Sequence, residues 1–101
     1  MKVLVEAHTY ELENFEKKDE KGQVLQFIQK EPVGDSLVTI SDGTTNEEVI
    51  EVLINRLQFL NSKFPCKENA VAITNLEQAL MWLEKRTKDR LKRQVEGKAL
   101  A

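Results

Sequence analysis

The residues best suited to chemistry in this sequence are arginines that succeed one another along a predicted helix. The apolar stripe of that helix continues beyond Leu83, at spacings of three and four residues, onto Arg86, Arg90 and Arg93. Because residues at these spacings share one face of a helix, the apolar face becomes a guanidinium face. Arginines four residues apart can present parallel planar forks to phosphate oxygens, whereas a lysine offers only a point charge. The spacing therefore favours a ligand with two phosphates.

The same arginines lie in a strongly basic segment, which leaves a second interpretation open. Residues 84–93 hold six basic and two acidic side chains, a net charge of +4, so the rest of this chain of net charge −2 carries −6. Basic side chains near the C-terminus of a helix complement the negative end of its macrodipole. By spacing alone, a phosphate clamp and a solvated basic helix end are equally good explanations.

Two further side chains fit a ligand site as well as a structural role. Phe59 lies on the far side of the first predicted helix from the stripe that contains Leu53 and Leu57. It is either an apolar residue outside that stripe, exposed or packed toward the sheet, or a stacking platform or interface anchor. Asn69 lies near the start of the second helix, where N-capping or local hydrogen bonding is its default role. Its amide could instead read the edge of a base or ribose.

Signals for catalysis and for metal binding are few. His8 is the only histidine and Cys66 the only cysteine, so the sequence contains neither a histidine pair for a metal nor an internal disulfide. Cys66 has no recognisable neighbouring base, and the glycines form no phosphate-binding loop. The sequence therefore predicts a protein that is not an enzyme and has no cofactor or metal.

Length and composition narrow the kind of protein further. A chain of 101 residues with 41% apolar content predicts a single domain spanning residues 1–101. So short a chain surrounds a ligand most readily at a subunit boundary, which predicts a homo-oligomer. The net charge of −2 gives no reason to expect duplex nucleic acid or an anionic membrane as partner. Without a signal peptide or an apolar run of about 18 residues, we expect a cytoplasmic protein.

The elements that must position these side chains divide into strands in residues 1–42 and helices in residues 43–101. Alternating and β-branched residues predict strands at 2–6, 9–15, 23–29 and 36–41, separated by a charged loop at 16–22 and a turn at 32–35. Hairpin connections between them predict one antiparallel sheet.

The second half of the chain predicts an antiparallel pair of helices. Capping-box spacing opens the first helix, with each threonine followed three positions later by a glutamate, at Thr44–Glu47 and Thr45–Glu48. This helix should end near residue 63, and the second should run from 67 or 68 to about 96, with Gly97 as its terminator. We expect the two helices to pack together and against the sheet. The predicted fold class is α+β, an N-terminal antiparallel β-sheet followed by a C-terminal antiparallel two-helix hairpin.

Short motifs spread over nearly the whole chain resemble those of a known family. They are YELENF at 10–15, QFI at 26–28, DGTTNEEV at 42–49, LN at 60–61, FP at 64–65, ALMWL at 79–83 with RT at 86–87, and VEG at 95–97. With them the chain resembles phage anti-Thoeris proteins of the sponge type. Its helical hairpin is also similar to that of the related phage anti-CBASS sponges, which counter cyclic-oligonucleotide defence.

The resemblance implies a homodimer or homohexamer that acts in the cytoplasm of the bacterial host. Such a protein binds glycocyclic ADP-ribose signals made by TIR-domain enzymes and withholds them without degrading them. The family's ligand-contacting positions fall here on Phe59, Asn69, Arg86 and Arg90, the residues that the helical geometry had set apart. Some members also hold cyclic di- or trinucleotides at separate sites formed by higher assembly.

In that site each residue type would have a distinct role. Phe59 would stack on a base or ribose, Asn69 would hydrogen-bond a polar edge, and Arg86 with Arg90 would neutralise the pyrophosphate. One alternative is a small oligomeric nucleic-acid-binding or regulatory protein that contacts phosphates through residues 85–93. Another is an enzyme that cleaves the cyclic nucleotide, which the lack of an acid and base pair disfavours.

Overall fold

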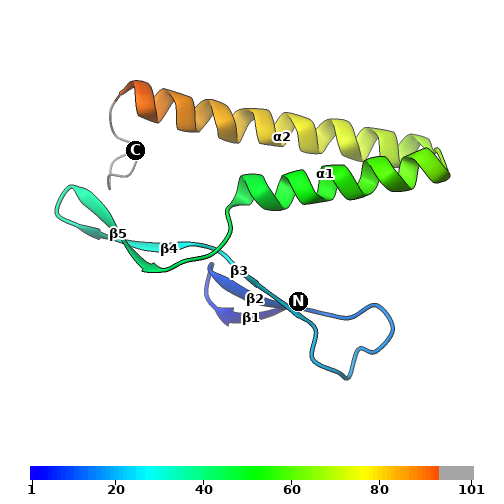
Figure 1. The fold of residues 1–101 in the computed structure, drawn as a ribbon, viewed down its shortest axis with the longest axis horizontal. Coiled ribbons are helices and arrows are strands. Elements are labelled where there is room, and N and C mark those ends of the chain that lie inside the picture. Colours follow the sequence, from blue (N-terminus) through cyan, green and yellow to red (C-terminus); the bar gives the residue numbers. More distant parts are fainter. Residues whose placement is uncertain (94–101) are drawn as a thin grey trace.

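The computed structural model describes residues 1–93, which form five strands followed by two helices (Figure 1). The strands are β1 (Lys2–Val5), β2 (Thr9–Leu12), β3 (Gln23–Gln26), β4 (Gln29–Val33) and β5 (Ser36–Ser41). The helices are α1 (Asn46–Lys63) and α2 (Lys67–Lys92). The predicted α+β class is thus confirmed. The expected helix end near residue 96 and its terminator Gly97 lie outside the described residues.

The strands form two antiparallel sheets, so the prediction of one sheet is wrong. Among residues 1–93, one sheet has the order β1-β2-β3, and the other consists of β4 and β5. The segment 23–29, predicted as one strand, divides at Phe27, whose N–H donates to the His8 carbonyl over 2.7 Å. The next N–H, that of Ile28, donates to the Thr44 carbonyl over 2.9 Å, so the backbone leaves the first sheet there.

At Phe27 the backbone passes from the first sheet toward the second, and this crossing is tightly packed. The Phe27 ring meets Tyr10 edge to face, with centroids 6.1 Å apart and planes at 84°. The chain passes the same point again at Gly43, where a Cβ would lie 2.5 Å from the Gln26 carbonyl oxygen. Only glycine fits so close a backbone approach.

Two loops differ from their predicted extents. Strand β2 ends at Leu12 rather than at residue 15, and the Asn14 amide lies 3.2–3.4 Å from three loop carbonyls, those of Lys17, Glu20 and Lys21. The predicted turn at 32–35 is shorter, because β4 continues through Pro32, which an edge strand tolerates. Gly34, with φ of 61°, opens the two-residue turn into β5.

The helices begin where local capping signals place them. The Thr45 hydroxyl oxygen accepts a hydrogen bond from the Glu48 N–H over 3.2 Å, which confirms the capping signal for α1. At the start of α2, the Cys66 sulfur accepts from the Asn69 N–H over 3.4 Å. Asn69 is therefore not the N-cap, because Cys66 fills that position three residues earlier.

Helices α1 and α2 lie side by side along the long axis of the molecule, and the strands form a separate region beside them (Figure 1). Among the described elements, helix packs on helix and strand on strand, so the expectation that the hairpin packs against the sheet is wrong.

None of the apolar side chains in residues 1–93 is fully buried. The chain exposes 8003 Å², whereas a compact monomer of 11.6 kDa exposes roughly 5,800 Å². Its radius of gyration of 16.9 Å likewise exceeds the value of about 13 Å for this length.

Candidate functional site

The four predicted site residues lie at opposite ends of the helical hairpin. Phe59 and Asn69 are close to the connection between α1 and α2, whereas Arg86 and Arg90 are near the open end, where α1 begins. Asn69 and Arg86 are 17 residues apart on one helix, which corresponds to roughly 26 Å. A single chain therefore does not bring the four side chains together.

Arg86 lines an open cavity at the end of the hairpin that meets the strand region. The cavity has a volume of about 510 Å³ and takes its walls from the β1–β2 turn, the Phe27 crossing, the start of α1 and the late part of α2. Its lining residues are Ala7, His8, Phe27, Ile28, Thr44, Thr45, Asn46, Glu47, Arg86 and Thr87. This junction is the place where the strands and the helices share a surface.

The two predicted phosphate ligands differ in exposure. Arg86 is exposed and makes no ion pair with any residue in the range 1–93. Arg90, one turn further along α2, is only 4% exposed. In one chain, Arg86 thus presents its charge to the cavity and Arg90 is covered. Within the basic segment, Lys85 is engaged by Asp89, with the ammonium 2.9 Å from the carboxylate.

Phe59 is 60% exposed, so it lies outside the core of the single chain. It lines a shallow depression of about 580 Å³ together with Val52, Arg56 and neighbouring polar residues. The Lys63 ammonium lies 5.6 Å from the centre of the Phe59 ring, within the range of a cation–π contact. Of the alternatives that helical geometry left open for Phe59, packing toward the sheet is thus excluded within the single chain.

Asn69 is half-buried in the first turn of α2. Its backbone N–H is taken by Cys66, but its side-chain amide has no hydrogen-bond partner in the part of the chain that the structure describes. The amide thus keeps its donor and acceptor capacity for a partner outside the chain.

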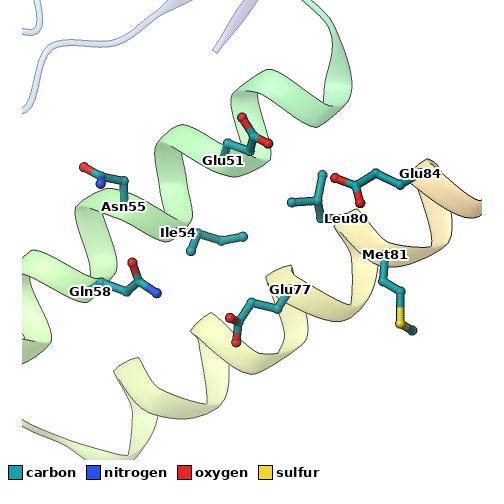
Figure 2. Close-up of a pocket in the computed structure, with 8 residues that line it drawn as sticks. All are labelled: Glu51, Ile54, Asn55, Gln58, Glu77, Leu80, Met81 and Glu84. Atoms are coloured by element: carbon teal, nitrogen blue, oxygen red, sulfur yellow. The ribbon is translucent and has the colours of Figure 1, made fainter.

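A groove between the helices has the opposite charge. Figure 2 shows Ile54 and Leu80 between the two helices, with carboxylates around them. The groove has a volume of about 410 Å³, and its charged lining residues are Glu51, Glu77 and Glu84. This grouping was not predicted, although the seven-residue spacing of Glu77 and Glu84 puts them on one helix face. A phosphate would be repelled from this groove, whereas the guanidinium of Arg86 can attract one to the cavity at the strand junction.

The two-helix hairpin that carries these residues is similar to a known protein family. The family described as Acb2/Tad1, hairpin domain, matches residues 23–88, more than half of the chain. The chain belongs to the Acb2/Tad1 hairpin family. The matched range begins at β3 and ends in α2, so it includes Phe59, Asn69 and Arg86, and Arg90 lies just beyond it.

A phage relative supports the same assignment to the Acb2/Tad1 family. The protein called Thoeris anti-defense 1, from Bacillus phage SBSphiJ7, is 59% identical over 58 residues. The match covers 56% of this chain and 41% of the relative, so less than half of the relative's length is represented. The resemblance to phage anti-Thoeris proteins is thereby confirmed. Within residues 1–93, neither α1 nor α2 has the length and apolar composition of a membrane-spanning helix.

Proposed function

We propose that this protein binds a glycocyclic ADP-ribose signal and holds it intact in the host cytoplasm, which keeps the signal from activating Thoeris defence. The observation that carries the proposal is Arg86, an exposed guanidinium on the wall of a cavity of about 510 Å³ in an Acb2/Tad1-type hairpin. The name of the phage relative, Thoeris anti-defense 1, supports the biological role.

The roles of the four residues follow from what each can offer a nucleotide. Arg86 and Arg90 neutralise the pyrophosphate, because a buried dianion is costly without paired charges. Phe59 stacks on the base or ribose. Asn69 hydrogen-bonds a polar edge through the amide that has no partner in the described part of the chain.

We further propose that each site is shared between two copies of the chain. The roughly 26 Å between Asn69 and Arg86 along α2 is too long for one nucleotide pocket. In a two-fold dimer, the same patch on both copies meets itself. Two hairpins that pack antiparallel in this way bring the Phe59 end of one copy to the Arg86 end of the other, twice per dimer.

The apolar face of the hairpin suits such a dimer better than the acidic groove does. Trp82 is 62% exposed and lies about 140–160° around α2 from Glu77 and Glu84. Val71, about 20° from Trp82 around the same helix, is also exposed. Two acidic grooves facing each other would repel, whereas two apolar faces gain by burial.

The size of the exposed surface is consistent with an obligate assembly. The surplus over a compact monomer is roughly 2,000 Å² per chain, and obligate interfaces bury about 2,000–5,000 Å² in total. Assembly beyond the dimer, to a hexamer, and binding of cyclic di- or trinucleotides at separate sites belong to the same proposal through the family resemblance.

The test is recovery of the ligand. The purified protein is incubated with glycocyclic ADP-ribose isomers, freed of unbound nucleotide and heated, and the released molecule is identified by mass spectrometry. We expect one intact nucleotide per composite site. A cleaved product would instead indicate an enzyme, and the absence of bound nucleotide would rule out the proposed function. Tight binding of duplex DNA or RNA with steep salt dependence would favour the nucleic-acid alternative.

A further inference from the structure

The cavity that contains Arg86 has a second wall from the strand region, and His8 forms part of it. The backbone holds His8 firmly, since its N–H donates to the Val5 carbonyl over 3.0 Å and its carbonyl accepts from the Phe27 N–H. The preceding residue, Ala7, has φ of 64°, in the left-handed region that side-chain-bearing residues rarely adopt. Backbone strain of this kind is concentrated at functional sites.

The hydrogen bonding of His8 determines which ring nitrogen carries the hydrogen. Nδ1 lies 2.9 Å from the Glu6 carbonyl oxygen, which can only accept, so Nδ1 is the donor. Nε2 has no hydrogen-bond partner among residues 1–93. In the neutral ring Nε2 is therefore a bare acceptor, and only the protonated ring has a second N–H to give to an anion.

The charged groups that share the cavity come from both helices. Arg86 comes from α2 and Glu47 from α1. Glu6 lies two residues before His8 on the same turn. A phosphate that enters the cavity beside Arg86 would add negative charge there, and negative charge near an imidazole favours its protonated form.

We propose that His8 is a further ligand-contacting residue of the site and donates Nε2–H to a ligand phosphate after taking up a proton. The inference rests on the proposed function and adds to it a contact from the strand region. Binding of the nucleotide is then coupled to proton uptake, and affinity rises as the pH falls through the range in which histidine changes its charge.

The expected size of the effect follows from linkage. For each unit by which the bound ligand raises the midpoint of the His8 titration, the affinities of the protonated and neutral forms differ by about tenfold. The disubstituted pyrophosphate of the ligand keeps its charge throughout this range, so a change in affinity reports on the protein.

The experiment follows the ring of His8 directly. Because this is the only histidine in the chain, tag-free protein gives a single Hε1 resonance, which is titrated by NMR with and without glycocyclic ADP-ribose. Calorimetry at pH 5.5 and 7.5, in buffers of different ionisation enthalpy, measures affinity and proton uptake. We expect the titration midpoint to rise on binding, uptake of up to one proton per site, and weaker binding at pH 7.5.

Two variants provide matched controls. His8→Asn keeps a side-chain donor in the place of Nδ1–H and removes Nε2, so binding at pH 5.5 should fall to the wild-type level at pH 7.5. His8→Lys carries a permanent charge, so its affinity should no longer depend on pH. The NMR titration of the unmodified protein decides the matter even if a variant fails to fold. Tight binding that is independent of pH and leaves the His8 resonance unmoved would overturn this inference alone, whereas no binding at either pH would overturn the proposed function with it.

Discussion

The two ends of the helical hairpin offer a nucleotide different chemistry. Near the connection between the helices, Phe59 and Asn69 present an aromatic face and an amide, and neither residue lines the cavity at the strand junction. At the open end, Arg86 presents a cation to a cavity walled on one side by the strand region. One end suits a base and the other suits a pyrophosphate, so each end has the groups that the other lacks.

The two faces of the hairpin differ in a comparable way. The groove lined by Glu51, Glu77 and Glu84 is acidic, whereas the opposite side exposes Val71 and Trp82. A two-fold interface brings a face against its own copy, so it requires a face that is compatible with itself. The apolar face meets this condition, and a dimer built on it can join the complementary ends of two hairpins.

The largest expected effect is loss of assembly. Trp82→Glu places a charge at the centre of the apolar face, where a second copy would have to desolvate it. Because Trp82 is exposed in the single chain, the substitution leaves the contacts within one copy undisturbed, and circular dichroism reports whether the separated copy keeps its helices. We expect light scattering to show a monomer and calorimetry to show no measurable nucleotide binding.

Met81→Glu is the matched control, since Met81 is also exposed but lies on the acidic groove. It should leave both assembly and binding intact. A Trp82→Glu variant that stays dimeric, or a monomer that still binds the nucleotide, would contradict the shared site.

The next effect concerns the phosphate end. Arg86→Ala should weaken binding by about 1.5–3 kcal/mol, the usual contribution of a charge-assisted hydrogen bond, and Arg90→Ala, which removes a second positive charge one turn further along α2, should also weaken it. Lysine at either position should recover only part of the loss, because it keeps the charge but not the planar fork. Calorimetry gives the affinities, and circular dichroism monitors the fold, which matters most for Arg90 because it is buried.

Lys88→Ala removes the same charge from another side of α2 and should leave the affinity almost unchanged. Equal losses for Lys88, Arg86 and Arg90 would mean that the helix end attracts the ligand only as a diffuse positive field.

Substitution of Phe59 should reduce the affinity as much as substitution of Arg86 or less. Together the two variants give the sharpest test of the shared site. Phe59→Ala should weaken binding by about 1–3 kcal/mol through loss of stacking. If sites are shared, mixing the Phe59→Ala and Arg86→Ala proteins creates mixed dimers in which one of the two sites regains both wild-type residues. With random exchange, calorimetry should then recover about one quarter of the wild-type number of tight sites.

A site formed within one chain predicts the opposite result for the mixed proteins. If all contacts come from one chain, every copy in the mixture lacks one essential residue, and no tight site appears. An unchanged affinity for Phe59→Ala, with a lowered melting temperature, would instead assign Phe59 to packing.

The sequence predicted the parts of this molecule that depend on neighbouring residues. The apolar stripes, the Thr45 cap and the start of α2 are local features, and helical geometry alone placed Phe59 outside the apolar stripe of α1. The division of β3 from β4 at Phe27 depends on Thr44, which is distant along the chain. The hydrophobic periodicity of the sequence carries no information about a pairing between residues so far apart.

Some features of the candidate site could likewise be predicted from the sequence, and others could not. Arg86 and Asn69 could be singled out by their places on one helix, but the capping of α2 by Cys66 depends on backbone geometry at the connection. The neighbourhood of His8 and Arg86 could not be predicted, because it arises where residues from opposite halves of the chain share a cavity.

The smallest expected effect concerns the strained turn that holds His8. Ala7 adopts a positive φ, which costs a residue with a Cβ roughly 1–2 kcal/mol. Glycine removes this strain but gives the unfolded chain more conformational entropy, worth about 0.5–1 kcal/mol. Ala7→Gly should therefore stabilise the protein by about 0.5 kcal/mol, a rise of about 2–4 °C in melting temperature when compared at equal protein concentration. Gly34→Ala makes the reverse change at another position of positive φ and should lower the melting temperature. A fall in stability for Ala7→Gly would mean that the methyl group of Ala7 contributes packing at the cavity that outweighs the relief of strain, and that the open end of the hairpin is braced by side-chain contacts as well as by its turn.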